Sequence, residues 1–204
     1  MKSNFIVSMV IAIALSSVSF AQFSNSNTST YKPETAAEGL KLSLLLPMLT
    51  AKTKISANNP ITGESISASD SEGIDTIGIG IGYANVPVNS VGFVGQVSFL
   101  TIDGDEGSEN TDTLRFDANA AYSVHEMAYV KGGVNFATFT SDNAKDFDGS
   151  FGLQLGVGVQ FTKNVGLDLT YTAMNFKFAE NIDGVEAKAE IELSGLEVGL
   201  TATF

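Results

Sequence analysis

The sequence predicts an all-β fold, an eight-stranded antiparallel up-and-down transmembrane β-barrel. Three observations support this prediction: strands with two unlike faces, a regular spacing of turns and a low share of charged residues. The clearest strand is 151–161 (FGLQLGVGVQF), where aromatic and aliphatic residues alternate with glycine and glutamine. Side chains alternate between the faces of a strand, so one face is apolar and the other small and polar. The pattern favours an apolar face toward lipid and a polar face toward a narrow lumen. A soluble lipocalin-like barrel is the rival, although it would carry charged residues on its solvated face.

Composition excludes several classes of function. The chain has 204 residues, of which 17% are charged, and it lacks cysteine, which excludes disulfides and thiolate metal sites. Its net charge of -12 argues against nucleic acid as a partner. Beyond the N-terminus no apolar run reaches the roughly eighteen residues of a helical membrane span. We expect no cofactor.

The N-terminus has the three parts of a signal peptide over residues 1–21. Lys2 supplies the positive charge, residues 5–15 (FIVSMVIAIAL) the apolar segment, and residues 19–21 (SFA) a small-residue cleavage site. Residues 22–39 are polar and show no period, so we expect a flexible periplasmic lead-in. The barrel is then predicted to span residues 40–204.

The first predicted strand, 40–56, has an imperfect pattern. Its outward phase is apolar, but its inward phase also contains Leu45, Pro47 and Leu49. Proline cannot donate to a strand ladder, so we expect an irregularity there. In the remaining strands, large apolar residues mostly alternate with Gly, Ser, Thr, Asn, Gln or single charges. These strands are predicted at 74–84, 91–102, 113–124, 128–136, 151–161, 165–172 and 188–204.

The connections are predicted to alternate between long and short. The long, polar ones are 57–71, 103–112, 141–148 and 180–186, and the short ones are 85–90, 125–126 and 163–164. This asymmetry is typical of outer-membrane barrels, which have tight periplasmic turns and longer external loops. The first long loop leaves room for an additional hairpin, which would give ten strands.

The C-terminus carries the most specific signal. In EVGLTATF, Glu197, Gly199, Ala202 and Phe204 follow the order of a barrel-assembly signal, with alanine where a larger residue is usual. On these residues and the strand pattern, the chain resembles the small eight-stranded outer-membrane barrels of the OmpA, OmpX and OmpW kind. The resemblance implies a location in the bacterial outer membrane and contact with the barrel-assembly machinery.

Five charged residues fall on the inward phase: Arg115, Asp117, Lys131, Asp168 and Glu197. An eight-stranded barrel is only wide enough for its own side chains, so inward charges are expected to pair. We predict one charged layer in the lumen. It would act as a salt-bridge plug or as a gate that opens a thin water path by alternative pairing.

Catalytic and metal sites receive little support. The single histidine, His125, falls in a predicted periplasmic turn near Ser123, and a Ser-His-acid site needs its members within hydrogen-bond reach. We therefore expect no enzymatic activity. The acidic loop 103–112, predicted to be external, offers only a weak set of candidate metal ligands, namely Asp103, Asp105, Glu106, Glu109 and Asp112.

Two functions stay open. The first is a structural or surface-interaction barrel with a plugged lumen. The second is a narrow, porin-like channel for ions or small apolar solutes, which the resemblance to the OmpW branch implies. The expected partners are outer-membrane lipid and lipopolysaccharide, together with the assembly machinery; an external ligand is not indicated.

Overall fold

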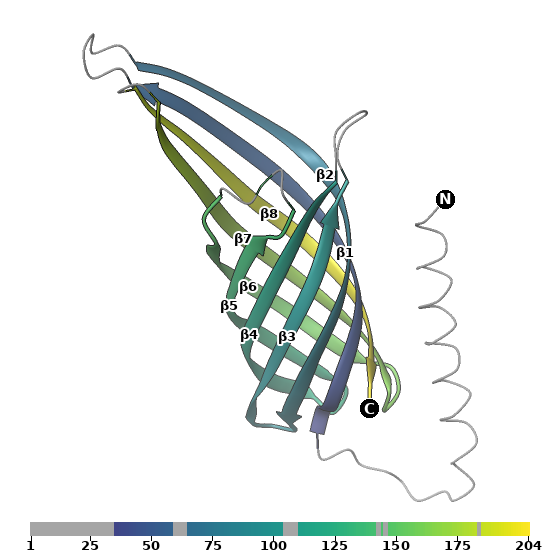
Figure 1. The fold of residues 1–204 in the computed structure, drawn as a ribbon. Helices are drawn as coiled ribbons and strands as arrows, with labels where there is room; N and C mark the ends of the chain where they lie inside the picture. Colours follow the sequence, from purple (N-terminus) through teal and green to yellow (C-terminus); the bar gives the residue numbers. More distant parts are fainter. Residues whose placement is uncertain (1–34, 59–64, 104–109, 142–143, 145–146, 183–184) are drawn as a thin grey trace, which may run out of the picture.

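The computed structural model describes residues 35–58, 65–103, 110–141, 144, 147–182 and 185–204. Within these ranges, eight antiparallel strands pair in chain order and β8 closes on β1 (Figure 1). The predicted fold is confirmed. The strands are β1 (Thr35–Asn58), β2 (Ser65–Pro87), β3 (Val91–Ile102), β4 (Thr111–His125), β5 (Ala128–Phe139), β6 (Ser150–Gln160), β7 (Val165–Ile182) and β8 (Val185–Thr203).

The two faces of the sheet are as the alternation predicts. On β6, Phe151, Leu153 and Leu155 are exposed on the outside of the barrel, whereas Gln154 and Gln160 are buried inside. The same outward apolar belt continues around the barrel. A continuous belt of exposed large apolar side chains is typical of a surface that faces lipid. No helix in the described ranges is long and apolar enough to cross a membrane.

The barrel begins earlier than predicted. Residues 1–34, which include the predicted signal peptide and most of the lead-in, lie outside the described residues. β1, however, starts at Thr35 rather than at residue 40. Ala36 and Ala37 are buried against Ala84 and Val86 of β2, so small apolar side chains at the foot of the lumen hold this segment in the sheet.

The closing seam depends on Gly39. This residue has φ of 123°, which favours glycine, and a Cβ added to it would lie 2.1 Å from the carbonyl oxygen of Phe204. Leu40 and Phe204 exchange both backbone hydrogen bonds, at 3.1 and 2.9 Å. Farther along β1, pairing with β2 is interrupted at Leu46 and Pro47, where the sequence predicts an irregularity.

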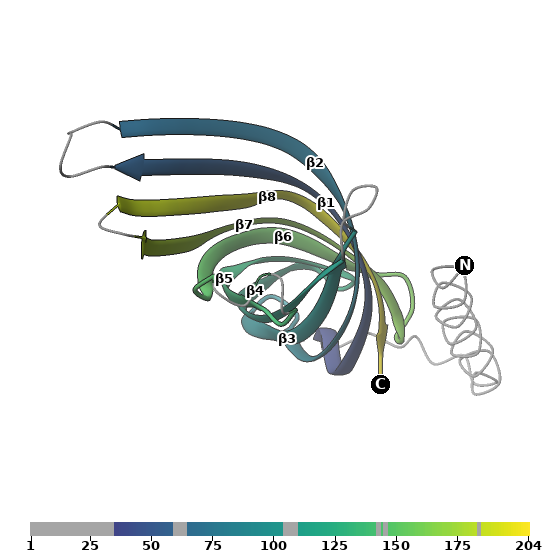
Figure 2. The same ribbon diagram turned by 45° about the horizontal axis from the view of Figure 1, so that its top comes forward.

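Two of the predicted loops are wrong. Most of 57–71 continues β1 and β2, and most of 180–186 continues β7 and β8. The described residues form a closed sheet of eight strands, so the ten-strand alternative is wrong. Figure 2 shows the result: β7, β8, β1 and β2 extend side by side well beyond the rim formed by the other four strands. We call this four-stranded part, residues 50–58, 65–75, 174–182 and 185–194, the extension.

The prediction failed because the two faces exchange polarity in the extension. Below it, apolar residues face outward; within it, the inward face carries Phe176, Leu193 and Ile191, while the outward face carries lysine, glutamate and serine. The register keeps its phase through the exchange. A segment such as SISASDSEG (65–73) therefore looks like a polar loop, although each of its residues has a pairing partner on β1.

Candidate functional site in the lumen

Arg115 connects opposite sides of the lumen. It rises from β4, is 1% exposed, and its Nη1 and Nη2 atoms lie 2.9 and 3.0 Å from the two carboxylate oxygens of Glu197 on β8. Its Nε also lies 3.0 Å from Asp117 on the same strand. Since β4 and β8 are opposite each other in an eight-stranded barrel, this ion pair, with one hydrogen bond from Nη2 to Oε1, crosses the lumen.

A second ion cluster is centred on Asp168 of β7. Its Oδ2 atom lies 2.8 Å from Lys131 Nζ of β5 and also pairs with Lys41 Nζ of β1, while its Oδ1 accepts a hydrogen bond of 2.8 Å from the Tyr129 hydroxyl. β1 and β5 are again opposite strands. Asp168 therefore joins two walls of the lumen through a single carboxylate.

Gly158 makes room for this cluster. A Cβ at this position on β6 would lie 2.2 Å from the Tyr129 ring and 2.6 Å from Asp168 Oδ1. Glycine on the inward face of 151–161 is therefore explained at Gly158: a larger residue would occupy the space that the Tyr129 ring and the Asp168 carboxylate fill.

The two clusters contain three cations and three anions, all at least 92% buried. Electrostatic interactions also link them, since Lys41 interacts with Glu197 and Asp117 with Lys131. All five predicted lumen charges therefore lie in the lumen and are paired. Sequence reasoning missed Lys41 and Tyr129, although each lies on the inward phase of its strand.

An apolar cluster covers the lumen above the charges. Ala51, Ala137, Met174, Phe176 and Leu193 are buried together, with Phe139 and Phe147 packed against them. The Phe139 and Phe176 ring centroids are 4.4 Å apart. Leu45 and Leu49 of β1 also face inward and are buried; Leu45 lies in the same cross-strand row as Asp168, and both flank Gly199. The ion clusters therefore lie between the apolar cap and the apolar residues at the foot of the lumen.

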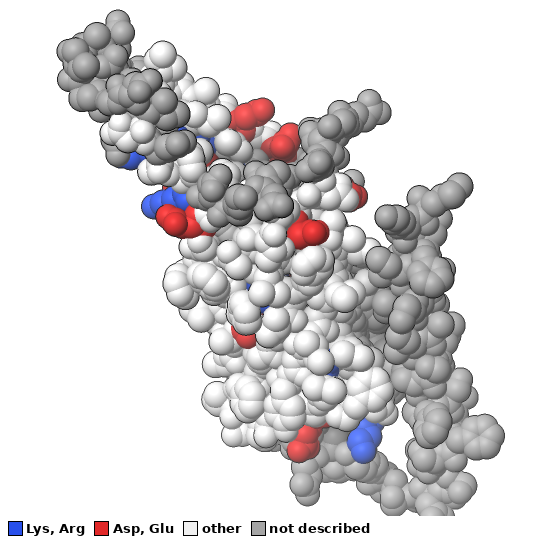
Figure 3. Space-filling view, viewed as in Figure 1, with Lys and Arg blue, Asp and Glu red and all other residues white. Residues whose placement is uncertain are grey.

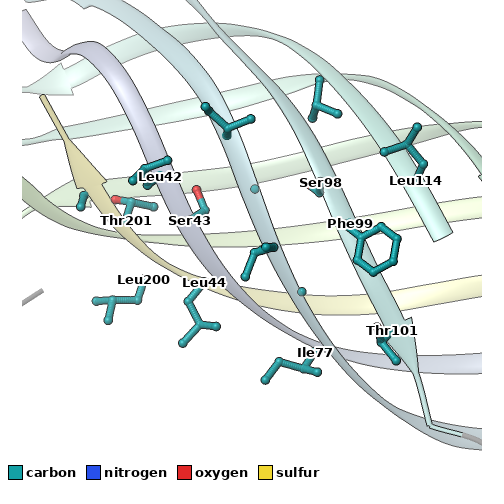
Figure 4. Close-up of a pocket in the computed structure, with 16 residues that line it drawn as sticks. Leu42, Ser43, Leu44, Ile77, Ser98, Phe99, Thr101, Leu114, Leu200 and Thr201 are labelled. Carbon is teal, nitrogen blue, oxygen red and sulfur yellow. The ribbon is translucent and has the colours of Figure 1, made fainter. Parts of the chain in front are cut away.

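The barrel wall also carries an apolar hollow, lined mostly by outward-phase residues. Figure 4 shows Leu44, Ile77, Phe99 and Leu200 around it. These side chains belong to the outward phase of β1, β2, β3 and β8. The hollow is thus part of the lipid-facing surface.

The other candidate residues have structural partners. His125 Nδ1 accepts a hydrogen bond from the Met127 N–H, and the Ser123 hydroxyl donates to the carbonyl of His125. Asp112 lies on β4 and accepts a hydrogen bond from Thr101, whereas Asp105, Glu106 and Glu109 lie outside the described residues. Across the described part of the chain, no group of three potential ligands is placed to hold a metal ion.

The residues of the predicted assembly signal alternate between the faces of β8. Glu197 and Gly199 point into the lumen, whereas Ala202 is on the outer face and Phe204 is exposed at the barrel end. Glu197 therefore belongs to the lumen cluster as well.

Comparisons with known proteins agree with this architecture. Residues 10–204 match the family model described as the outer membrane protein beta-barrel domain. No curated protein matches the chain. Among solved structures it is similar to the outer membrane protein OprG from Pseudomonas aeruginosa, at 11% identity and a TM-score of 0.47, over 83% of this chain and 99% of that one. It is also similar to Ail, the attachment invasion locus protein of Yersinia pestis (16% identity, TM-score 0.37, 78% and 99% covered) and to Neisserial surface protein A (16%, 0.37, 80% and 97%). At these identities the likeness concerns the fold alone.

Proposed function

The chain belongs to the outer membrane β-barrel family, and from this premise we propose a structural or surface-interaction role with a lumen plugged by salt bridges. The protein is located in the bacterial outer membrane. Its proposed role is non-enzymatic: the barrel presents its extension and loops outside the cell while its lumen remains closed to solutes.

The observation that carries the proposal is the pair of ion clusters between opposite walls. Arg115 is held by two contacts to Glu197 and one to Asp117, and Asp168 is held by two lysines and a tyrosine. Moving any of these groups aside to open a path would leave a buried charge without its partner. Such a state costs about 3–5 kcal/mol, so the closed arrangement dominates.

The test is single-channel conductance of the refolded protein in a planar bilayer, with folding established by a heat-dependent gel shift. The plug predicts no reproducible current steps from the folded wild-type protein. Reproducible steps that change in Glu197→Ala, but not in Glu192→Ala on the outer face of the same strand, would refute the plug and favour a gate.

A narrow channel for small apolar solutes is the second candidate. Its support is the apolar side chains that face the lumen, namely Leu45 and Leu49 of β1 and the cap around Phe176. Uptake of an uncharged apolar dye by vesicles containing the folded barrel tests it. Uptake above that of protein-free vesicles, abolished by Leu49→Arg, would favour this function over the plug.

A further inference from the structure

The outward face of the sheet shows where the membrane ends. Met48 on β1, Leu196 on β8 and Tyr171 on β7 form one cross-strand row, and all three are well exposed on the lipid side. The outward rows beyond it are small or polar, with serine, lysine and glutamate. In Figure 3, charged residues gather toward the extension, whereas the barrel below it is mostly white. The row of Met48 is therefore the last apolar row on the outer face of these strands.

The inward face of the extension stays apolar beyond this level. Ile55 of β1 lies opposite Ala68 of β2 and Ala189 of β8. Ile66 of β2 lies opposite Ala57, one inward row farther along. Ile55 is 54% exposed and Ile66 is 75% exposed. The apolar inward face therefore continues past the cap that closes the lumen, and there it is uncovered.

Lipid cannot cover this apolar face. Ile55 is seven residues beyond Met48, which is about 23 Å along the strand at ~3.3 Å per residue and about 16 Å along the membrane normal at a tilt of ~45°. The polar layer on each side of a bilayer is about 5–8 Å thick. Ile55 and Ile66 are therefore exposed to water, and an apolar patch that stays exposed to water is characteristic of an interaction site.

The charges of the extension differ between its two faces. Its four lysines all lie on the outward face, namely Lys52, Lys54, Lys177 and Lys188. On the inward face, β2 carries Asp70 and Glu72, and both are exposed. They lie two and four residues along β2 from Ala68. Since side chains two positions apart on a strand are ~6.7 Å apart on the same face, the two carboxylates border the apolar patch.

We propose that the inward face of the extension binds an extended, cationic peptide segment of an external partner. Apolar side chains of the segment contact Ile55 and Ile66, and its basic side chains reach Asp70 and Glu72. Alternate side chains of an extended peptide are also ~6.7 Å apart and point to one side. Two basic residues separated by one position therefore match the spacing of the two carboxylates.

Charge favours this occupant over others. Both charged side chains that border the patch are acidic, on a protein with a net charge of -12, so the face attracts a basic segment and repels an acidic one. A second copy of this chain would bring the same carboxylates into the contact, which disfavours self-association. The inference rests on the surface-interaction role proposed above. Its test is independent of the lumen, because a failure to bind would leave the plug intact and an ionic current would leave this face unchanged.

The experiment measures binding of a fluorescein-labelled peptide, VTVTKTK, to the folded full-length barrel in uncharged detergent micelles by fluorescence polarisation. Valine and lysine share one side of this peptide when it is extended. Asp70→Asn/Glu72→Gln should bind it about threefold to tenfold more weakly, because each exposed ion pair contributes up to about fivefold in affinity. Ile55→Ser/Ile66→Ser should bind it at least tenfold more weakly, because two apolar contacts are lost.

A matched variant and a matched peptide serve as controls. Glu190→Gln/Glu192→Gln changes the net charge by the same amount on the outward face of β8, and it should bind VTVTKTK as the wild type does. The peptide VTVTETE keeps the valines and reverses the charges, so it should not bind. Wild-type affinity for VTVTKTK should fall as NaCl is raised.

Three results would overturn the proposal, provided that the heat-dependent gel shift shows each variant to be folded. The first is binding of VTVTKTK by the Asp70→Asn/Glu72→Gln variant within twofold of wild type. The second is an equal loss of affinity in the Glu190→Gln/Glu192→Gln control. The third is equal wild-type affinity for VTVTKTK and VTVTETE, which would indicate an apolar surface without preference for a cationic partner.

Discussion

Replacing Glu197 with alanine is the most direct perturbation of the lumen. Glu197 is 5% exposed, accepts a hydrogen bond of 3.0 Å from Arg115 Nη2, and its other carboxylate oxygen lies 2.9 Å from Arg115 Nη1. Its loss leaves Arg115 with only Asp117 as a partner. The two clusters then contain three cations and two anions, so one buried positive charge is no longer balanced.

The expected cost is large for a single substitution. Removing one partner of a buried ion pair typically destabilises a protein by about 3–5 kcal/mol. Because Asp117 still neutralises part of the Arg115 charge, we expect the low end of that range, about 3 kcal/mol. Replacing both members of the bridge instead, as Arg115→Met/Glu197→Met, removes one charge of each sign and leaves two cations and two anions in the lumen. The double variant should therefore cost less than the single variant.

The measurement is urea unfolding of protein refolded into lipid vesicles, followed by tyrosine fluorescence and the gel shift of the folded band. Refolding without the assembly machinery matters because Glu197 also lies in the predicted assembly signal. Glu192→Ala, on the outer face of the same strand, is the control and should cost below about 1 kcal/mol. If Glu197→Ala and Glu192→Ala destabilise the barrel equally, the Arg115 bridge does not contribute to stability as described.

Three further outcomes follow from the close contacts. Gly158→Ala should destabilise the barrel by about 1–3 kcal/mol, because the added Cβ overlaps the Tyr129 ring. Gly95→Ala is the control and should be tolerated, since the nearest atom to its added Cβ is 3.8 Å away. Equal urea midpoints for the two variants would contradict this prediction. Gly39→Ala should slow or reduce barrel closure in a refolding time course, because the new Cβ meets the Phe204 carbonyl, and unchanged refolding would show that the seam can shift. Phe204→Ala should lower the amount of barrel in the outer membrane of cells while refolding into vesicles stays normal; equal loss in both assays would indicate a folding defect rather than a lost assembly signal.

The strand faces could be predicted because phase is a local property. Once residues 151–161 are recognised as alternating, the direction of each side chain follows from its position in the strand alone. The same reasoning placed Arg115 and Glu197 on the inward side before any partner was known. Lys41 obeys the same rule, but it lies between two leucines in the one strand whose alternation is broken, at Leu45.

The extension could not be predicted from the alternation that identifies the membrane-spanning strands. That alternation has apolar residues on the outward face, and it ends at the row of Met48, where the outer face meets water instead of lipid. Beyond that row, lysines and serines lie on the outward face and residues such as Phe176 and Ile191 on the inward face. This pattern suits strands whose outer face contacts water. Recognising it requires knowing that β7, β8, β1 and β2 remain paired there.

The sequence by itself determined that eight strands with an apolar outside and a small polar inside form a membrane barrel, since each strand carries that information in its own alternation. Only the tertiary structure decided which charges meet. Arg115 and Glu197 are 82 residues apart in the chain, and Lys41 and Asp168 are 127 apart. Their contacts depend on the register of every strand pair between them. The stagger of the closed sheet sets the height of each side chain in the lumen, and no single segment encodes it.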